Sequence, residues 1–260
     1  MKLRARQSQH RRTPRSARRA PHAGELPFVF SNFAITADGK IAFADRSFVP
    51  FAGKRDQQHM MELRATAEAV LSGARTIELS SATLGPGGRK YQQQRLRRGL
   101  PEYNLRVIVS GSGSINPNAE IFKHKFSPII VLTTERAPLR ARKQLEQCGA
   151  VVKTCGRREI NFRRAFRWLR TRWKVTRLLC EGGGELHDAI IRAGLLNELH
   201  LTISPKVFGG RTAPTLADGT GFLKLADAAH FELKSSRRVG DEIFLVYSAV
   251  GRQQSRLRSG

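Results

Sequence analysis

The segment with the clearest chemical potential is TRLLCEGGGELHDAIIRAGL, from Thr176 to Leu195, in which an apolar strand, three glycines and a helix follow one another. Glycine lets the chain turn sharply and lets backbone N–H groups come close to a ligand. The first turn of the helix offers unpaired N–H groups and the positive end of the helix dipole, a favourable place for a phosphate. A tight packing turn remains an alternative, because neither GxGxxG nor the GxxxxGK[ST] pattern is present. The segment thus predicts a phosphate seat or a structural turn.

Glu181 adds a reactive group to this turn, because it stands at the carboxyl end of the strand, where α/β proteins place their ligands. A carboxylate there can orient a polar substrate or transfer a proton. A second turn, Asp38-Gly39, ends the first strand, and Ser31, Asn32 and Thr36 supply polar groups nearby. His187 is interpreted as a residue of the helix surface rather than as a catalytic group.

Several kinds of site are excluded. The chain has no HExxH, no GxSxG and no His-x-Glu with a PCxxC partner, which argues against zinc proteases, serine hydrolases of the nucleophile-elbow type and zinc deaminases. Cys148, Cys155 and Cys180 form no CxxC pair and have no pair of histidines nearby. We therefore expect a reducing, cytoplasmic environment and no structural metal.

Strands and helices that alternate along the chain must position these groups. Strands are predicted at residues 27–35, 69–73, 105–109, 128–133, 150–154, 176–180, 198–203, 231–235 and 243–250. Helices are predicted from Arg55 onward and at residues 139–147, 161–173 and 186–193. Residues 80–104 have no hydrophobic period and are predicted to be a long exposed loop. The pattern predicts one α/β domain over residues 25–250, with helices on both faces of a mixed, mostly parallel sheet and a C-terminal antiparallel hairpin.

Charge is concentrated at the ends of the 260-residue chain, whose net charge is +25. Residues 1–24 hold eight basic side chains and no acidic one, and residues 251–260 add three arginines. Both segments are predicted to be disordered basic tails that make at most weak, non-specific contact with nucleic acid. The first tail resembles an organelle transit peptide in composition but lacks its amphipathic period, and no apolar run is long enough for a membrane span. On helix 161–173, the arginines opposite the apolar stripe are interpreted as a solvated face.

Four segments, in order and including the glycine turn, carry a resemblance to a known family. They are NFAITADGKIAF, MMELRATAEAVLSGART, LLCEGGGELHDAIIRAGLLNELHLTISPKVFGG and APTLADGTGF. Together, over about residues 27–250, they resemble the reductase domain of riboflavin biosynthesis, which is the C-terminal half of bacterial deaminase-reductases and the whole of stand-alone archaeal and fungal enzymes. The deaminase half has no counterpart here, so we expect deamination to belong to another chain.

The resemblance implies a dihydrofolate-reductase-like α/β/α fold, a homodimer, and NADPH-dependent reduction of the ribosyl group of a phosphoribosylaminopyrimidine to ribityl. The substrate is 5-amino-6-(5-phosphoribosylamino)uracil or its diamino analogue. By the same resemblance, Glu181 and Asn32 are expected to be catalytic, and Arg64 and Glu181 to bind substrate, with the guanidinium at the phosphate. The residues expected to bind the cofactor are Ala34, Thr76, Gly182, Gly183, Gly184, Glu185 and Leu186, in a stretch that continues to Ala189.

Three departures from the family pattern leave alternatives open. Asn32 stands where many bacterial members have lysine, Ser80-Ser81-Ala82 replaces an Asp-(Asp/Asn)-Pro segment, and Arg75 replaces a usual glycine. Arg75 either favours a phosphate-rich ligand or is solvated. The missing aspartate motivates a second hypothesis, a related NADPH oxidoreductase acting on a pterin or another substrate. A third hypothesis is a basic nucleic-acid-associated protein, although no base-reading motif is present.

Overall fold

The structure is a computed structural model that describes residues 25–250. The two predicted basic tails, at residues 1–24 and 251–260, and their expected contact with nucleic acid lie outside the described residues. The ordered alternation of strands and helices runs through the whole of the described part, as the sequence predicts.

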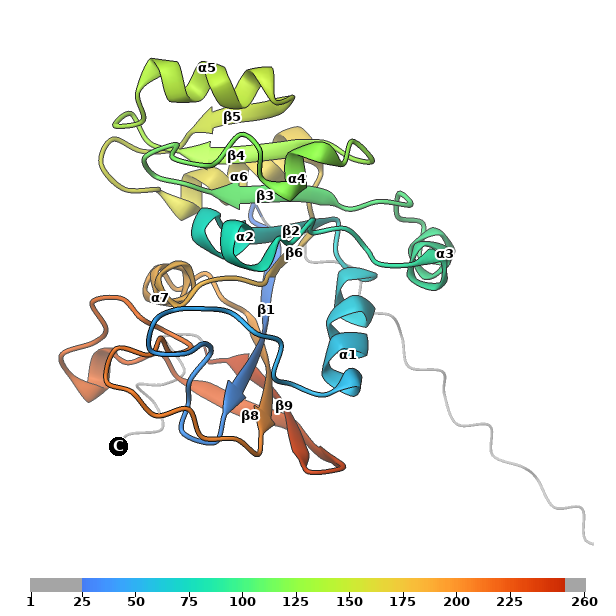
Figure 1. Cartoon of the computed structure of the whole chain (residues 1–260), viewed down its shortest axis with the longest axis vertical. Coiled ribbons are helices and arrows are strands. Elements are labelled where there is room, and N and C mark those ends of the chain that lie inside the picture. Colours follow the sequence, from blue (N-terminus) through green and yellow to red (C-terminus); the bar gives the residue numbers. More distant parts are fainter. Residues whose placement is uncertain (1–24, 251–260) are drawn as a thin grey trace, which may run out of the picture.

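One nine-stranded sheet forms the centre of the described chain, in the order β5-β4-β3-β2-β6-β1-β7-β9-β8 (Figure 1). The strands are β1 (Phe28–Thr36), β2 (Ala69–Gly73), β3 (Leu105–Val109), β4 (Ile129–Thr133), β5 (Ala150–Thr154), β6 (Arg177–Cys180), β7 (Glu198–Ser204), β8 (Phe231–Val239) and β9 (Glu242–Ala249). The pairs from β5 to β7 are parallel, whereas β9 pairs antiparallel with both β7 and β8. The mixed sheet and its C-terminal hairpin are therefore confirmed.

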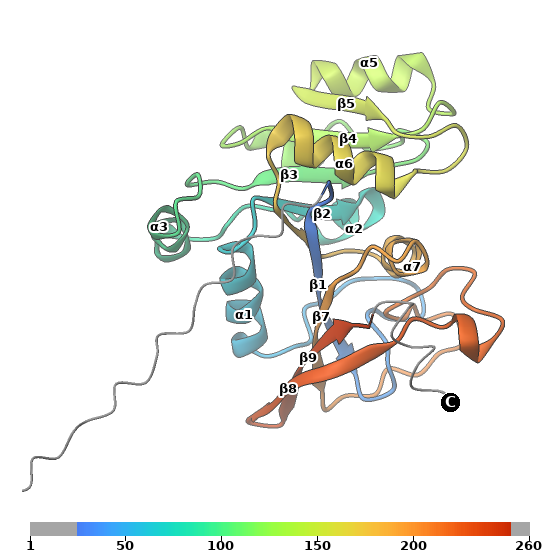
Figure 2. The ribbon, with the colours of Figure 1, turned by 180° about the vertical axis from the view of Figure 1, so that it is seen from behind.

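Helices cover both faces of this sheet, which gives the predicted three layers (Figures 1 and 2). They are α1 (Lys54–Arg64), α2 (Ala74–Ser80), α3 (Arg89–Arg97), α4 (Glu120–Lys123), α5 (Leu139–Gln147), α6 (Phe162–Trp173), α7 (Gly184–Arg192) and the short 3₁₀ turn η1 (Leu225–Asp227). Side chains of α6 and α7 join the core on one face, and side chains of α1, α2, α4 and α5 join the core on the other. The continuously apolar central strands are buried on both faces, as parallel strands between helices require.

The prediction of a long exposed loop at residues 80–104 is wrong. The segment contains α3, and the side chain of Arg95 is fully buried. Its guanidinium donates to the carbonyl oxygen of Pro101 and to those of Arg64 and Ala67, which lie at the end of α1 and just beyond it. A charged residue thus holds α3 in place. Hydrophobic periodicity does not reveal such a role, because it reports only apolar residues.

On α6 the predicted division of faces is confirmed. Phe162, Phe166 and Leu169 are buried, whereas Arg163 and Arg167 are exposed. Asn161 caps the helix by accepting a hydrogen bond from the backbone N–H of Arg164 at 2.9 Å. This fixes the start of α6 beside the carboxyl ends of the neighbouring strands.

Candidate active site

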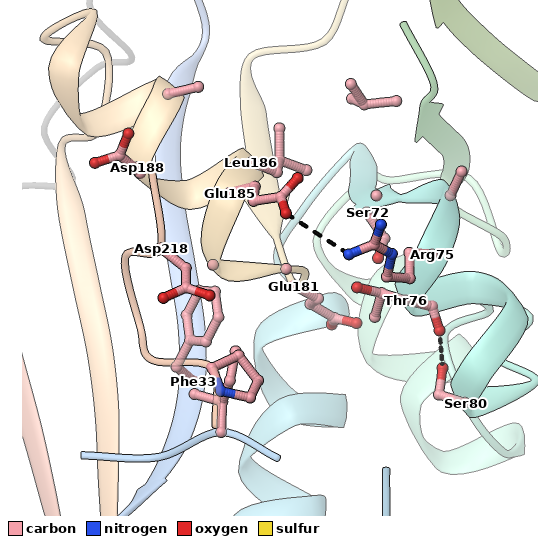
Figure 3. A pocket seen from close by; sticks show the side chains of 18 of the residues that line it. Phe33, Ser72, Arg75, Thr76, Ser80, Glu181, Glu185, Leu186, Asp188 and Asp218 are labelled. Atoms are coloured by element: carbon pink, nitrogen blue, oxygen red, sulfur yellow. Dashed lines mark hydrogen bonds and ion pairs between the residues drawn. The ribbon is translucent and has the colours of Figure 1, made fainter. Parts of the chain in front are cut away.

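A pocket of about 1810 Å³ lies at the carboxyl ends of β2, β3 and β6 and beside the second half of β1 (Figure 3). Its walls come from α1 and α2, from the first turn of α7, and from the segment that leads into α6. The volume exceeds the roughly 300–1,000 Å³ of a site for one drug-sized ligand. The pocket can therefore hold a dinucleotide and a second molecule side by side.

The glycine turn between β6 and α7 forms one wall of this pocket. A side chain at Gly182 would collide with the Ser72 hydroxyl, and one at Gly184 would collide with the Thr215 carbonyl oxygen. Gly183 has a φ of +69°, in the left-handed region that favours glycine. The glycines are therefore needed for close packing, and they also bring the backbone to the pocket. The interpretation as a packing turn and the interpretation as a phosphate seat thus apply to the same residues.

The residues at this turn fit the diphosphate of a dinucleotide. No side chain caps α7 at Gly183, so the N–H groups of its first turn are left for a ligand. The hydroxyl of Ser72, on the neighbouring strand, is buried in the pocket wall with no hydrogen-bond partner. Thr76 lies beside Gly183, and Ala34 and Leu186 line the same pocket. The structure therefore brings together the residues expected to bind the cofactor.

Glu185 joins this group through its backbone only. Its carboxylate is 68% exposed and lies 3.6 Å from the guanidinium of Arg75 (Figure 3). It also lies 3.8 Å from the guanidinium of Arg46. Such exposed ion pairs contribute little free energy. The exposure of Arg75 is consistent with a solvated side chain, and its place in the pocket wall keeps the phosphate-binding alternative open.

Glu181 and Arg64 form a buried ion pair in the pocket wall. Arg64 Nε and Nη2 donate to the two carboxylate oxygens of Glu181 at 2.7 and 2.6 Å, and the two side chains are only 8% and 6% exposed. Arg64 Nη1 also donates to the Gly85 carbonyl oxygen at 2.7 Å. The sequence predicted both residues as substrate-binding but not their pairing, which joins residues that are 117 positions apart.

The prediction that His187 lies on the helix surface is wrong. Its ring is fully buried, with Nδ1 3.0 Å from the Leu216 carbonyl oxygen and Nε2 2.9 Å from the Ser31 hydroxyl. The carbonyl can only accept, so Nδ1 carries the proton and Nε2 accepts from Ser31. Burial lowers the pKa of His187 to about 4, so the ring is neutral at pH 7. The residue ties α7 to β1 and does not line the pocket.

The polar residues predicted near the Asp38-Gly39 turn have different roles in the structure. Ser31 is engaged with His187, and the Thr36 hydroxyl donates to Asp38, whose carboxylate also accepts from the backbone N–H groups of Phe208 and Gly209. These bonds lower the pKa of Asp38 to about 2. Asn32 lines the pocket, and its Oδ1 is buried without a partner. Among these residues, Asn32 is therefore the one open to a ligand.

Sequence reasoning missed Asp56 and Ser72, both of which line the pocket with an unpartnered oxygen. Asp56 lies in the first turn of α1, where an acidic residue is ordinary, so its type carried no signal. The sequence of β7 did offer an indication of a polar environment beside α1. His200, Thr202 and Ser204 alternate there with apolar residues and therefore lie on one face of the strand. Thr202 of this face lies close enough to Asp56 to affect its pKa.

Ser80, which stands where the family pattern has an aspartate, lines the pocket at the end of α2. Its hydroxyl donates to the Thr76 carbonyl oxygen at 2.6 Å (Figure 3). Ser81 then ends the helix in the left-handed conformation, with a φ of 51°. This stretch therefore ends α2 and brings no acidic group to the pocket.

Two other kinds of site were sought among residues 25–250. No group of three or more His, Cys, Asp or Glu side chains there is arranged to hold a metal ion. In the same residues, no helix combines the length and the apolar character needed to cross a membrane. Cys148, Cys155 and Cys180 are free thiols, and burial raises the pKa of Cys180 to about 12.

Comparison with known proteins gives one consistent result. Residues 27–245 match the model of the RibD C-terminal domain. The chain is 29% identical over 225 residues to the 2,5-diamino-6-ribosylamino-4(3H)-pyrimidinone 5′-phosphate reductase of Methanothermobacter thermautotrophicus, with 86% of this chain and 99% of the relative covered. The reductase of the same name from Aquifex aeolicus is 24% identical over 232 residues, with 88% and 99% covered.

Solved structures show the same fold. A pyrimidine reductase-like protein from Corynebacterium diphtheriae superposes with a TM-score of 0.71 at 19% identity, covering 86% of this chain and 92% of that one. Acinetobacter baumannii RibD superposes with a TM-score of 0.72 at 19% identity, and there the match covers 87% of this chain but 58% of the longer one.

Proposed function

Because this chain belongs to the RibD C-terminal domain family of reductases, we propose that it reduces the ribosyl group of a phosphoribosylaminopyrimidine to ribityl with NADPH, in riboflavin biosynthesis. The observation that carries the proposal is the buried Arg64–Glu181 pair, which lies beside the glycine turn in a pocket with room for two ligands. The substrate is either 5-amino-6-(5-phosphoribosylamino)uracil or its 2,5-diamino analogue.

The cofactor, when bound, supplies a hydride, and the protein supplies position and electrostatics. The first turn of α7, Ser72 and Thr76 hold its diphosphate, while Ala34, on β1, lines the side that receives the nicotinamide. Such an arrangement fixes the reacting carbon of the sugar relative to the hydride donor, which is a large share of what a hydride-transfer enzyme contributes.

Glu181 and Arg64 act on the sugar. Opening of the ribosylamine breaks the bond from C1′ to the ring oxygen, which gains a proton, and the exocyclic nitrogen loses a proton as its double bond to C1′ forms. Reduction then adds a hydride at C1′ and a proton at the nitrogen. Two glutamate carboxylates line the pocket next to the glycine turn, and that of Glu181 is buried whereas that of Glu185 is exposed, so we assign the transfer of these protons to Glu181.

Arg64 holds the Glu181 carboxylate in place and presents a positive charge to the substrate. A planar guanidinium binds carboxylate and phosphate alike, so a substrate phosphate is positioned to compete for part of this contact. Asn32 completes the set, because its unpartnered Oδ1 accepts a hydrogen bond from the substrate.

The proposal extends to the state of the protein. By family resemblance we expect a homodimer, and from the use of cysteine we expect it to act in the cytoplasm, with contact to nucleic acid at most weak and non-specific. Free thiols at Cys148, Cys155 and Cys180 support the reducing compartment.

The direct test is turnover. Purified full-length protein is mixed with NADPH and either pyrimidine, the loss of nicotinamide absorbance is followed, and the product is identified by mass as the substrate plus two hydrogen atoms. Consumption of NADPH with at least one pyrimidine supports the proposal. Absence of turnover with both pyrimidines, in protein that binds NADPH, contradicts it.

One observation favours a second candidate. The family aspartate is replaced by Ser80, whose hydroxyl is committed to the Thr76 carbonyl oxygen, so the usual acidic group is missing from that wall. An NADPH oxidoreductase acting on a pterin would explain this change. Turnover with dihydrofolate but with neither phosphoribosylaminopyrimidine would select that function instead.

A further inference from the structure

The outer side of α6 concentrates positive charge. Residues 160–180 include seven basic side chains and no acidic one. Arg163 and Arg167 are exposed on α6, and Arg170 is half-buried. Lys174 follows the last helical residue and is also exposed. We call these four residues the α6 stripe. They are three or four positions apart, so they lie next to one another along one side of the helix.

The α6 stripe is held in place because the opposite side of the helix packs against the sheet (Figure 2). Phe162, Phe166 and Leu169 are buried there. Asn161 caps the start of the helix, which fixes its first turn. Eleven positions separate the two ends of the stripe, which corresponds to about 16 Å along the helix axis. The protein therefore presents a straight row of cations on a rigid element.

The contact that the stripe makes with Glu25 leaves its charge open to competition. The Glu25 carboxylate accepts from Arg167 Nε and Nη2 at 3.1 and 2.8 Å. The two side chains are 76% and 49% exposed, so the pair contributes little free energy and a phosphate can displace the carboxylate. Glu25 is also the first residue that the structure describes. Residues 1–24, with eight basic side chains and no acidic one, thus join the domain beside the stripe.

The chemistry of the stripe fits a polymer of phosphates. A planar guanidinium binds a phosphate with two hydrogen bonds, and three of the four residues are arginines. A single strand of nucleic acid carries one phosphate for each nucleotide on a flexible backbone, so successive phosphates can follow the row. A helix that binds a membrane surface carries large apolar side chains beside its cations. None of the large apolar side chains that are exposed in residues 25–250 lies on α6.

We propose that the α6 stripe binds single-stranded nucleic acid through its phosphates, as an activity separate from the reduction. The aromatic side chains next to the stripe, Trp168 and Trp173, pack against the core and do not offer a free face for bases. Phosphate contacts carry no information about sequence. The contact is therefore non-specific, and its strength is governed by the salt concentration.

The test measures the affinity of the full-length protein for a labelled, unstructured RNA of about 20 nucleotides by fluorescence anisotropy over a series of salt concentrations. The variant combines Arg167→Gln, Arg170→Gln and Lys174→Gln. Arg163 stays unchanged because it also lines the pocket. Each phosphate contact on a single strand contributes about 0.7 to the slope of log K against log salt, so the slope should become shallower by about 2. At low salt, the Kd should rise about tenfold or more. A DNA strand of the same sequence should behave like the RNA.

A matched control separates the position of the charges from their number. Arg97→Gln, Lys125→Gln and Lys224→Gln together remove the same charge from exposed positions on other elements. This control should keep the wild-type slope and Kd. Both triple variants should keep the wild-type thermal unfolding temperature and NADPH turnover, because none of the changed residues lines the pocket. If the α6 variant unfolds, Arg167→Gln and Lys174→Gln tested singly should each lower the slope by about 0.7.

The RNA measurement does not depend on turnover, so this inference and the proposed function can fail separately. An unchanged slope and Kd in the α6 variant, or an equal loss in the control, overturns the inference. Two other results would reassign the stripe. Retention on phosphatidylserine vesicles that is lost in the α6 variant, with RNA binding unaltered, would make it a membrane contact. A fall in kcat/KM at low salt, with RNA binding unaltered, would make it a guide for anionic substrates.

Discussion

Each face of the sheet beside the pocket carries a buried titratable residue, and the two residues differ in whether their polar atoms have hydrogen-bond partners. On the α7 face, both ring nitrogens of His187 have partners, Ser31 and the Leu216 carbonyl oxygen. On the α1 face, Asp56 is buried to a similar degree, but its Oδ1 has none. Burial opposes the charged form in both, lowering the pKa of His187 and raising that of Asp56.

This difference distinguishes residues that hold the fold from residues that await a ligand. A satisfied buried group such as His187 rigidifies the elements it joins. An unsatisfied one such as Asp56 lowers the stability of the free protein and regains the loss when a ligand supplies the missing bond. The Glu181–Arg64 pair lies between these extremes, because it is satisfied internally and still lines the pocket.

The largest effect is expected for Glu181→Gln, which tests whether the paired group is also catalytic. The substitution keeps the shape but removes the proton-carrying carboxylate and weakens the contact with Arg64. We expect kcat to fall by about a hundredfold to a thousandfold, within the range for loss of a general acid–base group. Steady-state kinetics with NADPH and the preferred pyrimidine measure it.

Affinity for NADPH serves as the internal control, because the diphosphate seat is formed by α7, Ser72 and Thr76 rather than by the Glu181 side chain. Glu135→Gln, which alters an exposed ion pair with Arg157, should keep full activity. If Glu181→Gln turned over at the wild-type rate, Glu181 would have only a structural role, like that of His187.

His187→Ala should show the cost of removing a satisfied buried group. The change leaves the Ser31 hydroxyl and the Leu216 carbonyl oxygen without their partner and opens a cavity beside Phe33, whose ring centre lies 4.5 Å from that of His187. We expect a loss of about 3 kcal/mol in the free energy of unfolding. Denaturant unfolding measures it, and His124→Ala, at an exposed position, should be nearly neutral.

The pH dependence of stability provides a second readout for the same residue. His187 has a pKa of about 4 in the folded protein, below its ordinary 6.5, so the unfolded chain takes up the proton first as the pH falls. The contribution of His187 to stability should be constant above pH 6.5 and fall by up to about 3 kcal/mol between pH 6.5 and 4. His187→Ala should reduce this slope, and part of it should remain because His59 also has a pKa of about 4. An unchanged slope in the variant would mean that His187 is not buried as a neutral ring.

The elements that the sequence predicted are those with strong local signals. Buried parallel strands such as β4 are uninterrupted apolar runs, and α5 and α6 have a clear helical period. The glycine turn and Glu181 could be placed because the end of a strand and the start of a helix were both evident. Each of these features depends on neighbours within a few residues.

The features that were missed depend on partners far away in the sequence. α3 is rich in arginine and glutamine, and what fixes it is the contact of Arg95 with carbonyl groups 28 and 31 positions away. His187 follows the helical period, but its burial against β1 results from tertiary packing, which the sequence of the helix alone does not show. Asp56 could not be recognised as a pocket residue before α1 was packed against β7. Patterns within one segment do not report such pairings.

Asp56→Asn should also change stability, in the direction opposite to His187→Ala. The folded pKa of Asp56 is raised, so its contribution to stability is present at low pH and is lost as the pH rises through that pKa. Removing the charge should therefore raise the free energy of unfolding at pH 7 by about 1 kcal/mol. Thermal unfolding without ligand measures it. Destabilisation by Asp56→Asn would show that the carboxylate is satisfied in the fold, and the contrast with His187 would disappear.

The smallest effect is expected for Arg75→Ala. Arg75 lies at the solvent-exposed rim of the diphosphate seat formed by α7, Ser72 and Thr76. Arg75 is 64% exposed and its partner Glu185 is 68% exposed, so stability should change by less than about 0.5 kcal/mol. Its charge still adds to the positive potential near the diphosphate seat, so the Kd for NADPH should rise a few-fold at low salt. This rise should vanish in about 1 M salt, where the screening length is about 3 Å. A loss of affinity of tenfold or more that persists in high salt would instead make Arg75 a direct phosphate ligand, since a bidentate contact within the pocket is screened far less than a rim charge.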